Sequence, residues 1–232
     1  REPFVEQSDH LAAVSESPPV DARRARRRSV ANSSAACWRR AWRRSPAWKR
    51  SREAGGIAVD DHMRTSNPHI YAVGDAAQKQ SALTGQDQMI WLANLANRHG
   101  RMVADVIAGE KVKARPSIGT GIIGAYGMAA ALTGLTEGLA KRLNIPHTII
   151  HLHPGSHAGY YPGTSTMHIK VLFDDAGKIL GAQACGFDGV DKRLDVFATA
   201  LRAGLTVQGL QELELSYAPP FGSAKDPVNM AG

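Results

Sequence analysis

The 232-residue chain carries a formal charge of +7, and that charge is concentrated at one end. Residues 1–52 hold 13 Lys and Arg against five Asp and Glu, whereas residues 53–232 hold 15 against 16. Because the remainder of the chain is nearly neutral, its charge argues against nucleic acid as a partner of the globular part. Hydrophobic residues make up 43% of the chain, enough for a core, and no apolar run approaches the length of about 20 residues that spans a bilayer.

Two cysteines, Cys37 and Cys185, are too few and too far apart for a disulfide framework, a CxxC redox pair or a zinc site. The amino end, Arg1–Phe4, has acidic residues close by and is not typical of a secretion signal. Together these features predict a reducing, cytoplasmic location. We expect Cys185, which stands between small residues, to be an inert buried thiol.

An irregular, Arg-rich segment occupies residues 1–54. Residues 22–52 contain twelve Lys or Arg and no acid, with three tryptophans and no apolar stripe at helix or strand spacing. Three interpretations stay open. The segment is a GC-rich stretch read out of frame, a disordered tail, or an arm whose arginines contact phosphates while its tryptophans stack on bases.

From residue 55 the pattern becomes orderly. Residues 57–59 and 70–73 are short apolar runs, and the second predicts a buried parallel strand that ends at Gly74-Asp75. A glycine at the carboxyl end of such a strand lets a ligand approach the backbone, and the aspartate offers it a carboxylate. An isolated Gly-Asp pair is more often a turn that merely ends a strand, and the sequence around it is what favours a ligand site.

The clearest predicted helix spans residues 88–108, followed by Gly109 at the position where a glycine often ends a helix. Its apolar residues at helical spacing are Ile90, Ala93, Ala96, Val103 and Ile107. The first turn of such a helix aims unpaired N–H groups at an acceptor. The charged stretch of residues 110–117 then predicts a linker between two domains.

Residues 118–232 alternate short strands with helices, which predicts an α+β layer. We expect a strand over residues 119–132, a helix capped by Thr136, a strand over 145–152, a hairpin of residues 167–173 and 179–187, and a helix over 188–203. His151, His153 and His157 lie close together without a further well-placed ligand. No metal site is therefore predicted.

Four blocks in this order resemble the pyridine nucleotide-disulfide oxidoreductases. The run Thr65–Asp75 resembles their second flavin-binding motif, and Leu92–Arg101 continues the likeness. The blocks His157–Gly163 and Ser216–Pro227 are similar to those of coenzyme A-disulfide reductases and related NADH oxidases. The resemblance implies an α/β remnant of an FAD-binding domain over residues 55–112, followed over 118–232 by an α+β dimerisation domain with an antiparallel sheet and helices.

The resemblance also implies ligands for FAD. Asp75 would hold the ribitol, with Thr65 and Gly74 in the same motif, and the backbone near Leu92 and Ala93 would donate to the flavin C2 carbonyl.

For the substrate, the resemblance implies that Tyr160, or its neighbour Tyr161, and Tyr217 act across a homodimer on coenzyme A disulfide. A phenol of pKa about 10 stays protonated at neutral pH and can protonate a departing sulfur. Lys225 would meet a coenzyme A phosphate, and Asn97 falls at a coenzyme A contact. The alternatives are interface packing for Tyr160 and Tyr161, and a solvated helix position for Asn97.

The predicted activity is FAD-dependent NAD(P)H:disulfide reduction, in a chain that corresponds to the carboxy-terminal portion of such an enzyme. Residues 119–124 have GxGxxG spacing but lie within a predicted strand, so they do not lead from a strand into a helix as a dinucleotide-binding loop does. No cysteine opens a helix either, and we expect no turnover from this chain alone. Two alternatives remain: an NADH oxidase or peroxidase on the same scaffold, and a non-catalytic, truncated dimerisation module.

Overall fold

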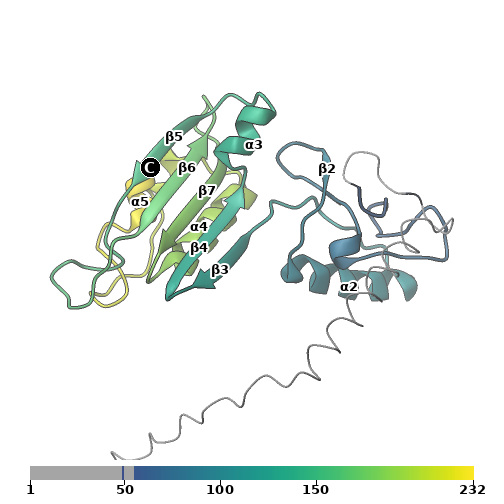
Figure 1. The fold of residues 1–232 in the computed structure, drawn as a ribbon, viewed down its shortest axis with the longest axis horizontal. Coiled ribbons are helices and arrows are strands. Elements are labelled where there is room, and N and C mark those ends of the chain that lie inside the picture. The colour runs from purple at the N-terminus through teal and green to yellow at the C-terminus, as the bar shows by residue number, and fades with distance from the viewer. Residues whose placement is uncertain (1–48, 50–54) are drawn as a thin grey trace, which may run out of the picture. The chain divides into compact units, whose positions relative to one another are not determined.

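The computed structural model describes residue 49 and residues 55–232, which fall within one compact unit (Figure 1). Apart from Lys49, the Arg-rich segment predicted over residues 1–54 lies outside the described residues. Its three interpretations therefore stay predictions. In the part of the chain that is described, no helix is long and apolar enough to cross a membrane.

Residues 55–112 form few regular elements. These are the 3-10 helix η1 (Gly74–Ala76), strands β1 (Lys79–Gln80) and β2 (Asp87–Gln88), which pair antiparallel, and helix α2 (Ala93–Ile107). The strand predicted over residues 70–73 does not form. Only Tyr71 pairs, in an isolated antiparallel bridge with Arg64, and the run is half-buried. A parallel strand needs partners from distant segments, and the described residues supply none to this run. The run over 57–59 likewise makes a single bridge, from Ile57 to Ala77.

Helix α2 begins five residues later than the sequence predicts, after Leu92 in an extended N-cap conformation. Its buried side chains are Leu95, His99 and Met102, and Ile107 is exposed. These three positions follow helical spacing, but the stripe includes a histidine, which the apolar pattern did not count. Burial, with help from the cations Arg98 and Lys79, lowers the pKa of His99, so the ring packs in its neutral form. Gly109 has φ +97°, which confirms it as the residue that ends the helix.

Residues 118–232 form the predicted antiparallel sheet. Its strands are β3 (Gly121–Ala125), β4 (Met128–Gly134), β5 (Thr148–Leu152), β6 (His168–Phe173) and β7 (Ile179–Gly186), in the spatial order β3-β4-β7-β6-β5. The single strand predicted over residues 119–132 is instead the β3–β4 hairpin. Its turn places Tyr126 at φ 52° and Gly127 at φ 78°, as a type I′ turn requires. A tyrosine in that conformation is uncommon, which is why the sequence did not reveal the turn.

The helices of this region are α3 (Glu137–Arg142), α4 (Val190–Ala203) and α5 (Pro227–Ala231), with the 3-10 helix η2 (Gln208–Leu210). The predicted cap of α3 is confirmed, because the amide of Leu139 donates to Thr136 Oγ1 at 3.3 Å. Helix α4 packs on β7 and β4, and α5 contacts α4 and β5, so both lie on one face of the sheet (Figure 1). The core lies between this face and α4, and its fully buried members include Ile169, Val171, Leu194 and Phe197.

The backbone of Leu135, just before α3, lies close against β7 at Leu180 and Gly181. The amide of Leu135 donates to Leu180 O at 2.9 Å. A Cβ at Gly181 would lie 2.0 Å from Leu135 O, so this position has no room for a side chain. On the β3–β4 hairpin, in contrast, several large apolar side chains are exposed: Ile122, Ile123, Tyr126, Met128 and Leu132.

Candidate functional site

Asp75 is exposed on a turn whose backbone carbonyls accept hydrogen bonds from the buried Lys79. Gly74 has φ +71°, and its carbonyl accepts a hydrogen bond from Lys79 Nζ, which also donates to Ala77 O at 3.0 Å. Burial lowers the pKa of Lys79, and the nearby charge of Asp75 opposes that shift. The carboxylate of Asp75 is exposed and can accept hydrogen bonds from the hydroxyls of a sugar alcohol.

Thr65, also predicted to contact the cofactor, is buried and uses its hydroxyl within its own turn. Its Oγ1 donates to Asn67 O at 3.1 Å and accepts from the amide of Asn67 at 3.2 Å. The Thr65 amide donates to Ile70 O at 2.9 Å. Thr65 therefore shapes the turn before Gly74, and its contact with a cofactor stays a prediction.

The start of α2 supplies free backbone donors. The amides of Leu95 and Ala96 donate to Leu92 O, at 3.2 and 3.1 Å. Among residues 49 and 55–232, the amides of Ala93 and Asn94 have no acceptor, and Ala93 is exposed. Helix α2 packs against η1, so these donors and Asp75 belong to adjoining elements. An exposed carboxylate beside unpaired helix N–H groups fits the hydroxyls and the carbonyl of the expected flavin.

Tyr160 and Tyr217 meet, although 57 residues separate them in the sequence. Their hydroxyl oxygens lie 2.7 Å apart, and either group can donate. The side chains are 75% and 47% exposed, so the pair faces outward. Its hydrogen bond with Tyr217 raises the pKa of Tyr160, which keeps that phenol protonated at neutral pH.

Two adjoining loops carry the phenols. The amide of Ala158 donates to Gly222 O at 3.0 Å, which joins the loop of residues 156–165 to that of 216–226. The half-exposed Tyr161 packs edge-on against His157, and Lys225 is exposed on the second loop. The structure thus brings Tyr160, Tyr161, Tyr217 and Lys225 onto neighbouring loops.

Other predicted site residues lie elsewhere. Asn97 is exposed on α2. In the described ranges, no hydrogen bond or ion pair links the phenol loops to Asn97 or to Asp75.

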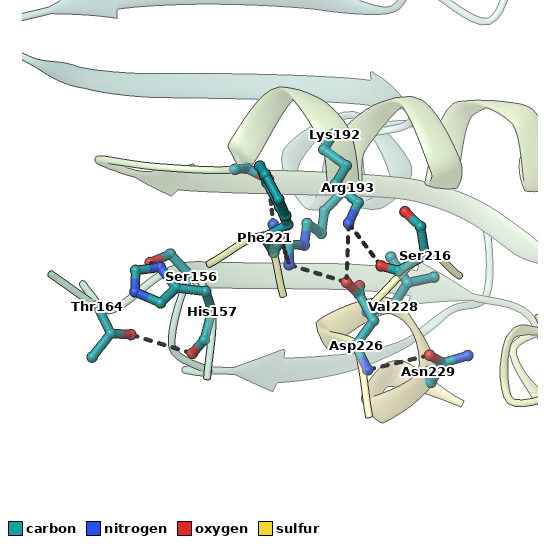
Figure 2. Close-up of polar contacts among 11 residues, drawn as sticks. Ser156, His157, Thr164, Lys192, Arg193, Ser216, Phe221, Asp226, Val228 and Asn229 are labelled. Atoms are coloured by element: carbon teal, nitrogen blue, oxygen red, sulfur yellow. Dashed lines mark hydrogen bonds and ion pairs between the residues drawn. The ribbon is translucent and has the colours of Figure 1, made fainter. Parts of the chain in front are cut away.

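Sequence reasoning missed a buried ion pair beneath these loops. Arg193 Nη2 lies 3.0 Å from Asp226 Oδ2, and the two residues are 1% and 3% exposed (Figure 2). Asp226 also caps α5, with its carboxylate accepting from the amide of Val228. Aspartate followed by Pro227 is a helix-start signal that could have been recognised. The burial of an arginine within α4 has no such signal.

His151, His153 and His168 gather at the sheet face opposite α4, whereas His157 lies on the loop of residues 156–165. His153 Nδ1 and His168 Nδ1 lie 2.8 Å apart, and both rings line a cavity of about 800 Å³ with His151 and Cys185. Cys185 is half-buried, so the prediction of a buried thiol is wrong. Its side chain alternates away from the α4 core. Among the described residues, no group of three or more His, Cys, Asp or Glu side chains is placed to hold a metal ion.

Comparisons with known proteins match two stretches of the chain to one family. Residues 44–100 match the pyridine nucleotide-disulphide oxidoreductase family, and residues 126–227 match the dimerisation domain of that family. The chain is 36% identical over 180 residues to coenzyme A disulfide reductase from Staphylococcus aureus (strain bovine RF122 / ET3-1), which covers 77% of the chain and 41% of that relative. The Staphylococcus haemolyticus enzyme is 35% identical, covering 78% and 41%. The chain therefore spans about two fifths of the length of these relatives.

Solved structures are similar as well. Reduced CoADR-RHD from Bacillus anthracis has a TM-score of 0.76 and 49% identity, over 79% of this chain and 33% of that one. The NAD-dependent persulfide reductase from A. fulgidus has a TM-score of 0.76 and 34% identity, over 79% and 34%. Water-forming NADH oxidase from Lactobacillus brevis has a TM-score of 0.74 and 25% identity, over 79% and 41%. This chain belongs to the pyridine nucleotide-disulfide oxidoreductase family.

Proposed function

We propose that the chain forms part of an FAD-dependent NAD(P)H:disulfide oxidoreductase that reduces coenzyme A disulfide. The observation that carries the proposal is the contact between the Tyr160 and Tyr217 hydroxyls, 2.7 Å apart on an exposed edge. The curated relatives named coenzyme A disulfide reductase support this choice of substrate.

The phenols act as proton donors. In the whole enzyme a redox thiolate would attack one sulfur of the disulfide and form a mixed disulfide with it, and the other sulfur would leave as a thiolate that takes a proton from the phenol pair. The hydrogen bond that raises the pKa of Tyr160 keeps that proton in place until a stronger base arrives. A flavin, when bound, passes electrons from the nicotinamide to the disulfide. Asp75 and Gly74 would hold its ribitol, and the free amides after Leu92 would face its ring carbonyl.

The phenols serve the partner subunit of a homodimer in this proposal. Both side chains are largely exposed, and within residues 55–232 nothing bonds them to the turn of Asp75. Tyr161 and Lys225, on the same loops, would contact coenzyme A, with the lysine paired to a phosphate. Asn97, on α2, would contact it from the flavin side. The scarcity of cysteine supports a cytoplasmic location.

A chimera tests the phenols. Residues 55–232 would replace the matching portion of the Bacillus anthracis relative, so that the host supplies the nucleotide-binding parts. We expect Tyr217→Phe to slow coenzyme A disulfide reduction by about 100-fold, because a general acid contributes at least that much. Flavin absorbance should not change. Tyr126→Phe, at the exposed hairpin turn, is the control, and equal rates for the Tyr217 variant and the parent would refute the assignment.

The same chimera tests Asp75. Asp75→Asn removes the charge that accepts the ribitol hydroxyls, so more flavin should be lost during gel filtration, measured by the ratio of visible to ultraviolet absorbance. Asp175→Asn, at an exposed turn far along the chain, is the matched control. Full flavin retention in the Asp75 variant would contradict the proposed ligand.

A second candidate function is an NADH oxidase, favoured by the likeness to the Lactobacillus brevis enzyme. Thiol release from coenzyme A disulfide without oxygen, compared with oxygen consumption without disulfide, separates the two activities. The third interpretation, a non-catalytic dimerisation module, predicts that the 232-residue chain purifies as a colourless dimer. A yellow absorption band in that preparation would speak against it.

A further inference from the structure

Two adjacent cations of α4, Lys192 and Arg193, face the loop that carries Tyr217. Figure 2 shows both side chains directed toward Asp226, with Phe221 and Ser216 nearby. Arg193 Nη2 pairs with Asp226 at 3.0 Å and also lies 3.4 Å from Phe221 O, to which it donates. Lys192 Nζ donates to Ser216 O at 3.4 Å. Two neighbouring side chains of α4 thus hold the loop at Ser216, directly before Tyr217, and at Phe221 and Asp226, which follow it.

The loop is fitted closely around these charges. A Cβ at Gly222 would lie 3.3 Å from Arg193 Nη2 and 3.8 Å from Lys192 Nζ, so the backbone runs directly over both cations. Within the loop, the amides of Phe221 and Gly222 donate to Ala218 O, and the amide of Ala158 joins the neighbouring loop to it. Asn229 fixes the far end by donating to Leu210 O and Leu213 O.

An arginine is the side chain that this arrangement needs. Arg193 is 1% exposed, and a charge removed from water must be paired where it lies. Its guanidinium spans Gly189 O on its own helix, Phe221 O and the Asp226 carboxylate. A lysine in its place keeps the charge but has a single ammonium and cannot make these contacts in a fixed plane.

We propose that Arg193, assisted by Lys192, is a positioning residue for the phenol pair. By fixing the loop of residues 216–226 on α4, it places the Tyr217 hydroxyl against that of Tyr160. Its effect on catalysis rests on the proposed function of the phenols, whereas its effect on their geometry does not. A purely structural Arg193 would change stability and leave the phenol pair intact in the folded protein.

The 232-residue chain with ¹³C-labelled tyrosine allows the geometry to be measured directly. Ring-carbon shifts followed against pH give the titration of Tyr160, and ring-to-ring NOEs report its contact with Tyr217, below the unfolding temperature of each variant. We expect Arg193→Lys to return the pKa of Tyr160 toward its ordinary value and to weaken the NOEs. Asp226→Asn should do the same, because asparagine preserves the cap of α5 but removes the charge.

Two further variants protect the test against misfolding. Lys192→Met removes the contacts of a half-exposed side chain with Ser216 O at 3.4 Å and with the Asp226 carboxylate at 4.0 Å, so the chain should fold and show a smaller effect of the same kind. Arg202→Lys makes the same exchange in the last turn of α4, where the guanidinium reaches Pro116 O and not the loop, and should show none. Wild-type titration and NOEs in folded Arg193→Lys and Lys192→Met would overturn the proposal.

A double-mutant cycle in the chimera joins the geometry to catalysis. We expect Arg193→Lys to lower kcat about 10- to 100-fold with little change in KM, since misplacing a reacting group costs that much. In a Tyr217→Phe background it should then add little, because both changes act through one hydroxyl. Fully additive losses would contradict a positioning role. If Tyr217→Phe leaves the rate unchanged while Arg193→Lys still disrupts the pair, the proposed function fails and the positioning role stands.

Discussion

Residues 118–232 and residues 55–112 differ in how much of their backbone is paired and how many of their side chains are buried within the region itself. The first region forms a five-stranded antiparallel sheet packed under α4, whereas the second, apart from helix α2, pairs its backbone through isolated bridges and two-residue strands. The large side chains that are almost wholly inaccessible to solvent, from Thr133 to Val228, all belong to the first region. Antiparallel strands joined by a short turn pair with each other, whereas a parallel strand pairs with a strand from a distant part of the sequence. The turn of Gly74 and Asp75 is therefore held by fewer contacts within its own region than the loops that carry Tyr160 and Tyr217.

The sharpest way to break this comparison is to remove a core side chain from each region. Phe197→Ala, on the buried face of α4, should lower the free energy of unfolding by about 3–5 kcal/mol. Leu95→Ala, the buried start of α2, should cost about 2 kcal/mol, the low end for leucine, because fewer elements surround it. Urea denaturation gives both values. Equal losses would show that the two regions are equally consolidated.

Gly181→Ala tests the backbone contact that joins the sheet to the segment before α3. Its methyl group would meet Leu135 O, so we expect a loss of about 1–3 kcal/mol. Gly138→Ala, in α3, meets nothing within 4 Å and should instead stabilise the chain by about 0.5–1 kcal/mol. Thermal unfolding distinguishes these opposite signs. A stabilising Gly181 variant would mean that the two segments are further apart.

Thr136→Ala removes the hydroxyl that caps α3 and should cost about 1 kcal/mol. Thr136→Ser retains an acceptor and should recover most of that loss. The measurement is the urea midpoint of each variant. An alanine variant as stable as the parent would show that α3 is held by packing and not by its cap.

The smallest effect concerns Glu137, whose hydrogen bonds from Lys141 and Lys170 lower its pKa to about 2. Its contribution is fully present above its unfolded pKa near 4.5 and is lost as the pH falls toward about 2. Parent and Glu137→Gln should therefore differ in stability at neutral pH and converge in acid. Glu212→Gln, on the exposed surface, is the control. A difference that persists at the acid end would contradict the shift.

The sequence was most informative where a local signal had a local cause. The cap at Thr136, the β6–β7 hairpin and helix α4 all rest on contacts between residues near one another in the chain. The start of α2 was displaced because Gln88 pairs with Lys79 in a short ladder, which periodicity cannot reveal. Block resemblance selected Tyr160 and Tyr217. Their contact and the burial of Arg193 depend on how two distant loops meet.

Strand β3 has a consequence for any measurement of assembly. It is an outer strand that pairs only with β4 in the described part of the chain, and it exposes Ile122 and Ile123. An edge strand of this kind can pair with a strand of another molecule. That pairing would extend the sheet without involving the tyrosine loops. A molecular mass of two chains therefore does not identify the pairing that completes a flavin pocket. Crosslinking from the residues beside Tyr217, and not from β3, is the measurement that does.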